Sequence, residues 1–158
     1  MADILQKQSV SLVWDNGAGY DLTLASLANA AGRQGEKHDF GALFPQYARF
    51  ELLLDFNVAP TAGNVVEVWW ASSIDNTDFD AECTGADAAF ATATKRFRLH
   101  FVGTLSASND TDPQRASWLF ALPARYGAPV IWNASGQALT ATEADQVLTV
   151  TPLPGDVS

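Results

Sequence analysis

The sequence contains a single cysteine, Cys83, among its 158 residues. A lone cysteine cannot form a disulfide within the chain, and it excludes a zinc site built from several cysteines. Histidine is almost as scarce, with only His38 and His100 present. We therefore expect a fold held together by packing alone, with no metal and no cofactor.

Charged residues are also few, and most of them are acidic. Asp, Glu, Lys and Arg make up 17% of the sequence, against about 25% in a typical globular protein. Nine basic and eighteen acidic residues give a net charge of −9. Because this charge repels polyanions, nucleic acid is not expected as a partner.

Long apolar runs are missing as well. No window approaches the roughly 20 apolar residues of a membrane helix, and the opening MADILQKQSVSLVW lacks the pattern of a signal peptide. We therefore expect no membrane partner and synthesis in the cytoplasm. The length suits one domain spanning residues 1–158, since a chain of this size buries about 70% of its unfolded surface.

What the sequence does contain is a series of short β patterns. In Tyr47–Phe56 apolar and polar residues alternate, so that Phe50, Leu52 and Leu54 face one side. Val65–Ala71 follows the turn VAPTAGN, and these two segments are expected to form a hairpin. A third alternating segment, KRFRLHFVGTL, predicts that its apolar side chains share the core of Tyr47–Phe56. Those side chains are Phe97, Leu99 and Phe101.

Turn residues separate the remaining expected elements. Ala25–Arg33 is interpreted as a loop, and GADAAFA as a short helical turn. Further strands are expected at Ser9–Trp14, Tyr20–Leu24, Trp118–Leu122, within YGAPVIWNASGQAL and at Gln146–Thr151. About eight short strands with regular turns predict an all-β fold, an antiparallel two-sheet sandwich of jelly-roll type.

Candidate catalytic or metal-binding groups are sparse. Both histidines are interpreted as solvated side chains, and no Ser-His-Asp spacing is recognisable, so we expect no enzyme. The loop from Asp75 to Glu82 and the pair Asp110 and Asp112 carry oxygen ligands that calcium accepts. Their spacing is not that of an EF-hand, and the expected role is a solvated acidic loop, with calcium binding as the alternative.

Two features suggest an interface. Trp69 and Trp70 are adjacent, so their side chains lie on opposite sides of a strand, and at least one is expected to leave the main core to contact a loop or another subunit. Arg96 and Arg98, with Lys95, form a basic stripe that a nearby Arg49 would extend. The stripe is either a solvated strand face or a docking strip for an acidic neighbour. Trp69, Trp70, Arg96 and Arg98 are therefore the candidate interface residues.

Three stretches together resemble a family of small structural proteins of tailed bacteriophages. They are SVSLVWDNGAGYDLTLASLANAAGRQG, APTAGNVVEVWWASS and PARYGAPVIWNASGQALTATEADQVLTVTPL, which cover nearly the whole chain. The most specific parts are the Val-Trp-Asp-Asn-Gly turn, the Ala-Pro-Thr-Ala-Gly hairpin and the Tyr-Gly-Ala-Pro-Val strand entry. The resemblance implies a non-enzymatic β-sandwich, made in the host cytoplasm, that assembles in many copies on the virion head or tail.

The function hypothesis that follows is a virion structural protein, with a capsid decoration or cement role ahead of a tail, fibre or adaptor role. Its expected partners are other copies of itself and the major capsid protein or a tail component. The alternative is a carbohydrate-binding sandwich, which would require an exposed aromatic platform. The residues that could form such a platform are Tyr20, Trp69, Trp70 and Trp132.

Overall fold

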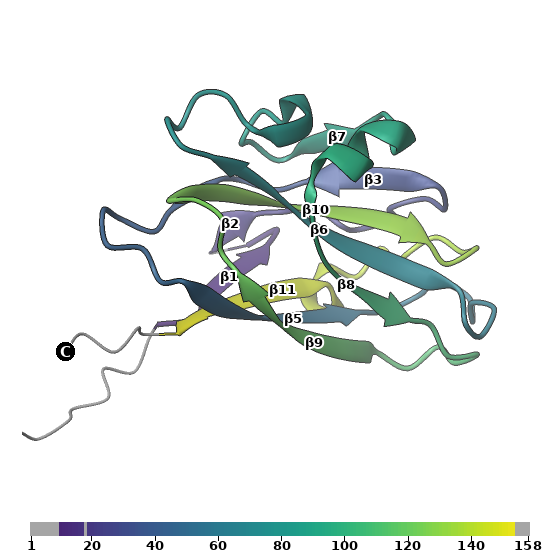
Figure 1. The fold of residues 1–158 in the computed structure, drawn as a ribbon. Helices are drawn as coiled ribbons and strands as arrows, with labels where there is room; N and C mark the ends of the chain where they lie inside the picture. The colour runs from purple at the N-terminus through teal and green to yellow at the C-terminus, as the bar shows by residue number, and fades with distance from the viewer. Residues whose placement is uncertain (1–9, 18, 154–158) are drawn as a thin grey trace, which may run out of the picture.

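The computed structural model describes residues 10–17 and 19–153, which form two β-sheets packed face to face (Figure 1). Sheet A contains, in spatial order, β2 (Tyr20–Asp21), β1 (Leu12–Asp15), β11 (Val147–Leu153), β5 (Tyr47–Leu54) and β9 (Gln114–Ala121). Sheet B contains β7 (Ala88–Phe90), β3 (Ala31–Gln34), β10 (Tyr126–Ala134), β6 (Val65–Ser73) and β8 (His100–Ser106). The two-residue strand β4 (His38–Asp39) also pairs with β10.

The pairing of the eight longer strands is nested. β1 pairs with β11, β3 with β10, β5 with β9 and β6 with β8, all antiparallel. The chain is thus one long hairpin rolled into two sheets, which is the jelly-roll arrangement. This confirms the predicted all-β, antiparallel two-sheet sandwich, although a parallel contact between β1 and the short β2 adds to it.

The predicted hairpin between Tyr47–Phe56 and Val65–Ala71 is wrong. Both segments are strands, but β5 lies in sheet A and β6 in sheet B. The turn VAPTAGN therefore carries the chain from one sheet to the other. A local turn signal shows that the chain reverses direction, but it does not determine which sheet receives the next strand.

Three smaller predictions also need correction. Strand β3 begins at Ala31, inside the segment expected to be a loop, and GADAAFA contains strand β7 instead of a helical turn. Both strands are rich in Ala and Gly, so their pairing with β10 and with each other overrides a weak local preference. The predicted strand Tyr20–Leu24 is extended only at Tyr20–Asp21. Of the predicted Ser9–Trp14 strand, Ser9 lies outside the described residues.

Helical structure is limited to three short 3-10 turns in the described chain. They are η1 (Asp80–Glu82), η2 (Ala93–Arg98) and η3 (Glu143–Asp145). In the same residues, no helix is long and apolar enough to cross a membrane.

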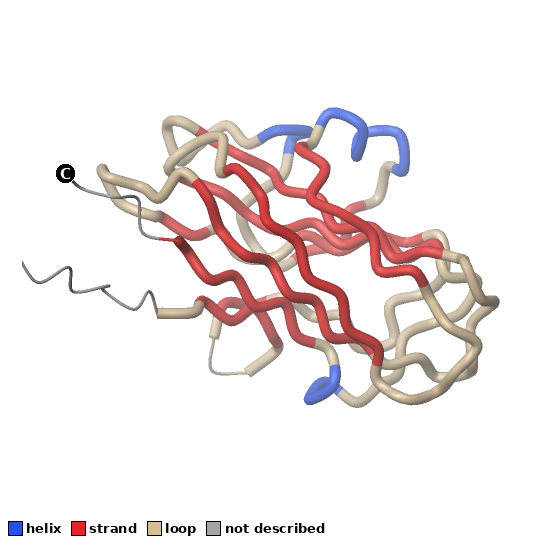
Figure 2. Tube along the Cα trace, turned by 60° about the horizontal axis from the view of Figure 1, so that its bottom comes forward, coloured by secondary structure: helices blue, strands red, loops and turns tan. Residues whose placement is uncertain are grey.

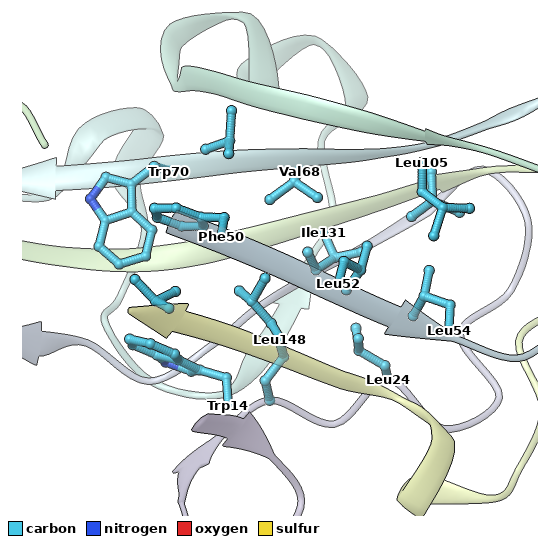
Figure 3. Packing of buried hydrophobic residues seen from close by; sticks show 14 of the residues in the cluster. Trp14, Leu24, Phe50, Leu52, Leu54, Val68, Trp70, Leu105, Ile131 and Leu148 are labelled. Carbon is cyan, nitrogen blue, oxygen red and sulfur yellow. The ribbon is translucent and has the colours of Figure 1, made fainter. Parts of the chain in front are cut away.

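The main core lies between the two sheets (Figure 3). Phe50, Leu52 and Leu54 of β5 are completely buried, as their alternation predicted. The Phe50 ring meets Trp70 of β6 edge to face, with 5.3 Å between the ring centroids. Trp14 of β1 meets Trp70 in the same way at 6.0 Å. These aromatic contacts connect the two sheets within the core.

Glycine allows the Trp70 ring to lie flat against strand β10. A Cβ atom on Gly127 would lie 2.2 Å from the indole nitrogen of Trp70. Gly103 of β8 has the same relation to Trp118 of β9, also at 2.2 Å. A side chain at either position would displace a buried or half-buried tryptophan, so both strands need glycine at these points.

A second apolar cluster covers the outer face of sheet B. Trp69, Val130 and Trp132 project from this face, and Phe79 and Leu99 from the segment between β6 and β8 cover them. In Figure 1 that segment lies above β6 and β3. Trp69 and Trp70 therefore do face opposite sides of their strand, as predicted, and each has its own cluster.

The prediction that Phe97, Leu99 and Phe101 share the core of β5 is wrong. Leu99 belongs to the second cluster, while Phe97 is 66% exposed and Phe101 is 51% exposed. Residues 93–98 form η2, and strand β8 begins only at His100. The alternating letters of this segment therefore do not correspond to alternating directions in an extended strand.

Candidate interaction surfaces

The outer face of sheet A is open. Figure 2 shows its strands in front, and no segment of the described chain crosses them. Side chains of three neighbouring strands form rows on this face: Leu153 lies opposite Tyr47, and Tyr47 lies opposite Ala121. Leu119 is in the next row, opposite Arg49. Tyr47 is 49%, Leu119 66% and Leu153 37% exposed, so apolar groups lie together in solvent.

Two arginines lie on the same face: Arg49 is opposite Leu119, and Arg115 lies two rows further along the sheet, opposite Leu53. Arg49 Nη2 lies 3.1 Å from Glu51 Oε2, and Arg115 Nη1 lies 3.1 Å from Glu51 Oε1. The side chains of Arg49 and Arg115 are 59% and 61% exposed, whereas that of Glu51 is 28% exposed. We call the group of Tyr47, Arg49, Arg115, Leu119 and Leu153 the arginine patch.

The outer face of sheet B carries a second exposed apolar surface. Phe97 and Phe101 both lie edge-on to Trp69, with ring centroids 6.0 and 4.9 Å from the Trp69 ring. The guanidinium of Arg96 lies between Phe97 and Trp132, 4.5 and 4.8 Å from the two ring centroids. We call the two exposed rings, Phe97 and Phe101, the aromatic ledge.

The two predicted interface tryptophans are not at the surface. Trp70 is completely buried in the main core. Trp69 is 8% exposed, because residues 79–99 of the same chain cover its ring. The platform expected for a sugar-binding protein is not formed by the candidate residues either. Trp132 is buried in the second cluster, and Tyr20 is half-buried, stacked on Trp14 at 4.9 Å.

The residues of the predicted basic stripe form ion pairs with acidic residues of the same chain. Arg96 Nε contacts Glu67 at 2.8 Å, and both side chains are only 17% exposed. Lys95 and Arg98 both contact Glu82, at 2.6 and 3.4 Å. The acidic partners, Glu67 and Glu82, lie in other parts of the chain. The sequence around the stripe therefore does not show that its positive charges are neutralised. Arg49, which was expected to extend the stripe, lies on the opposite sheet.

The first carboxylate of the acidic loop, Asp75, binds neighbouring groups of the chain itself. Asp75 Oδ1 accepts hydrogen bonds from the backbone N–H groups of Asp78 and Thr77, at 3.0 and 2.9 Å, and from the Ser73 hydroxyl at 2.9 Å. These bonds, that from Asp78 above all, lower the pKa of Asp75. In the part of the chain that the structure describes, no group of three His, Cys, Asp or Glu side chains could hold a metal ion.

We therefore expect calcium removal to leave the melting temperature unchanged. A calcium ion bound to the folded state would stabilise it by mass action, and chelation would remove that stabilisation. The measurement is a pair of calorimetric melts, one with excess calcium and one with EGTA. A drop of several degrees in EGTA would restore the calcium-binding alternative for the loop.

The fold does bring a serine, a histidine and an aspartate together. Ser72 Oγ donates to Asp80 Oδ2 at 2.5 Å and lies 3.1 Å from His100 Nε2. Asp80 Oδ2 lies 3.2 Å from that same nitrogen. In a hydrolytic triad the acid instead orients the other ring nitrogen, and the histidine accepts the serine proton. The group therefore serves to connect β6, η1 and β8.

The other histidine lies between the sheets. His38 Nδ1 is 2.6 Å from the Tyr20 hydroxyl, and the ring packs edge to face against Phe40 with 4.6 Å between centroids. Burial lowers the pKa of His38, which the nearby Asp39 carboxylate only partly opposes. His38 is thus a neutral packing residue at neutral pH.

Sequence reasoning missed most of the arginine patch. Tyr47, Leu119 and Leu153 were not recognised, although apolar residues at outward positions of three neighbouring strands are the signal that marks them. Arg115 gives no such signal alone, because only the pairing of β5 with β9 brings it next to Glu51. Comparison with known proteins adds no assignment: the sequence matches no protein-family model and no curated protein.

Proposed function

We propose that the protein is a non-enzymatic structural protein of a tailed-bacteriophage virion, acting as a capsid decoration protein. The observation that carries this proposal is the presence of two exposed apolar surfaces on opposite faces of one sandwich. The arginine patch lies on sheet A, and the aromatic ledge lies on the outer side of sheet B. A protein that joins neighbouring subunits needs two such surfaces on a rigid body.

The composition of both surfaces supports this role. Protein interfaces are enriched in Tyr, Phe and Arg and combine an apolar centre with a polar rim. The arginine patch combines Tyr47 and Leu119 with two arginines on one face of sheet A, and in the aromatic ledge the Arg96 guanidinium lies 4.5 Å from the centroid of the Phe97 ring. The sequence resemblance to phage structural proteins implies the same class. A tail, fibre or adaptor role would use the same surfaces and is the alternative within that class.

Attachment to virus particles tests the proposal. Purified, fluorescently labelled protein is mixed with particles assembled without it, and bound protein is measured after sedimentation. We expect saturable attachment to the particles and no signal on a glycan array run in parallel. Selective glycan binding without attachment to particles would instead support the carbohydrate-binding alternative.

The aromatic ledge gives a specific prediction in this assay. Changing Phe97 and Phe101 together to serine should weaken attachment at least about tenfold, since buried aromatic anchors dominate interface energies. The melting temperature should stay nearly constant, because both rings are exposed. Val58→Ser is the matched control, removing an apolar side chain that is 52% exposed in the turn between β5 and β6. Equal attachment of both variants would rule out the ledge as a contact surface.

A further inference from the structure

We infer that the arginine patch docks an acidic protein surface, with carboxylates of the partner on Arg49 and Arg115 and an apolar side chain of the partner on Leu119. This inference rests on the proposed function, which it extends by stating the chemistry of one partner. Three observations lead to it: the local charge of the patch, the free donors of its arginines and the position of its apolar residues.

The local charge of the patch is opposite to that of the whole protein. The chain carries a net charge of −9, whereas two arginines and one glutamate leave the patch with one positive charge. An acidic partner is repelled by the rest of the surface and attracted here. The charge distribution therefore selects the orientation in which such a partner approaches.

The arginines of the patch have N–H donors that the chain itself does not use fully. Arg33 binds Asp87 through two nitrogens, at 2.5 and 2.6 Å, and Arg125 binds Asp39 through two nitrogens, both at 2.6 Å. Both of these arginines are used by carboxylates of the same chain. Arg49 and Arg115 each make one longer contact of 3.1 Å with Glu51 and are about 60% exposed. A guanidinium has five N–H donors, so each can still bind a carboxylate from a partner, with two bonds in parallel.

Glu51 also sets the positions of these arginines. It lies on β5 between them and contacts one with each of its carboxylate oxygens. Its side chain is 28% exposed, less than half as much as either arginine, so it is the more fixed member of both pairs and limits where the two guanidiniums lie before a partner arrives. Binding then costs less side-chain entropy than it would with two freely moving arginines.

Apolar contact and charge together identify the kind of partner. Leu119 lies directly opposite Arg49, and Tyr47 lies one row away, so a partner side chain that covers Leu119 also shields the contact at Arg49 from water. Nucleic acid would be repelled by the net charge of the protein. A second copy that used the same patch would bring four arginines and two glutamates into one interface and leave two positive charges without a partner. An acidic protein surface with an apolar side chain satisfies all three observations.

The probe for this inference is a pair of synthetic peptides. One contains eight glutamates and two leucines, and the other has glutamine in place of each glutamate; each is titrated into ¹⁵N-labelled protein. We expect the glutamate peptide to shift the amide signals of Arg49, Arg115 and Leu119, and the shifts to weaken as salt rises from about 50 to about 500 mM. The glutamine peptide should leave these signals in place. An absence of shifts at the patch with millimolar glutamate peptide would overturn the inference.

Variants of the two arginines test whether the peptide binds at the arginine patch. The double variant Arg49→Glu, Arg115→Glu should reduce the affinity for the glutamate peptide at least tenfold. If this variant does not fold, the double variant Arg49→Gln, Arg115→Gln removes both positive charges without reversing them and should also bind the peptide more weakly. Arg98→Glu is the matched control, since it reverses an arginine that is 63% exposed but lies outside the patch. An equal loss of affinity in the Arg98 variant would contradict the assignment to the patch.

The same variants separate this inference from the proposed function. If the native protein attaches to particles and the Arg49, Arg115 variants attach equally well, the inference fails while the virion role stands. If the native protein does not attach but the glutamate peptide binds at the patch, the virion role fails and the inference stands. Self-association in sedimentation equilibrium that these variants abolish would overturn the inference by assigning the patch to a second copy.

Discussion

Replacing Phe50 by alanine is expected to lower the free energy of unfolding by about 3–5 kcal/mol. Phe50 lies completely buried in the middle of β5. Its ring contacts Trp70 of the opposite sheet and Phe120 of the neighbouring strand, with centroids 5.3 and 5.4 Å away. Alanine would leave a cavity between the two sheets that these large rings cannot fill without moving. Urea unfolding of both proteins gives the difference.

The matched control is Phe101→Ala, which removes the same side chain from β8. Phe101 is 51% exposed and lies edge-on to Trp69 of the outer cluster. We expect this change to cost less than about 1 kcal/mol, as for most substitutions away from the core. Equal losses in the two variants would mean that β8 does not present Phe101 to solvent.

These two phenylalanines show where sequence reasoning succeeds and where it ends. Both occur in segments with alternating apolar and polar letters, and the alternation predicts both as core residues. It holds for β5, which is extended over its whole length. It fails for Phe101, although β8 is extended from His100, because Val102 and Leu105 are the apolar residues of β8 that face the core. The letters predict that side chains alternate, but they do not determine which side of the strand meets the core, and the turn at residues 93–98 has already interrupted the pattern.

Replacing Asp87 by alanine is expected to cost about 3 kcal/mol of unfolding free energy, since it leaves a largely buried charge without its partner. Asp87 accepts hydrogen bonds from Arg33 at 2.5 and 2.6 Å, and from the Thr23 hydroxyl and backbone N–H at 2.6 and 3.1 Å. The Arg33 and Asp87 side chains are 27% and 15% exposed. The carboxylate joins β3 to the loop after β2 and to the start of β7.

Acid titration gives a second measurement for this variant. Burial raises the pKa of Asp87, but the hydrogen bonds from Arg33 and Thr23 outweigh burial, and its pKa is lower than that of a free aspartate. A carboxylate with a lowered pKa contributes stability above its unfolded pKa, and this contribution is lost as the pH falls through the folded pKa. The difference in stability between the native protein and Asp87→Ala should therefore shrink in acid.

Glu82→Ala is the control for Asp87→Ala. Glu82 also contacts two cations, Lys95 at 2.6 Å and Arg98 at 3.4 Å, but its side chain is 66% exposed. Water screens such pairs, so the unfolding midpoint should hardly move. A large loss at Glu82 would show that exposure does not distinguish the two carboxylates.

The sequence predicts more of the architecture than of the surface. Jelly-roll class, the core face of β5 and the opposite directions of Trp69 and Trp70 all follow from local patterns. The partners of Arg96 and Arg115 do not, because each depends on which strands or loops the fold brings together. Arg96 had appeared available for docking and is paired with Glu67. Arg115 gave no signal in the sequence, yet the pairing of β9 with β5 makes it part of an exposed surface.

The nested strand order has a consequence for biosynthesis. The two strands of the sandwich that are synthesised last, β10 and β11, are the middle strands of sheets B and A. A nascent chain that ends before Tyr126 has neither, so neither sheet can assemble around its centre until both strands have been made. Chains truncated before β10 consequently lack the centre of both sheets and not merely one edge. Folding of the sandwich during synthesis therefore waits for its last two strands.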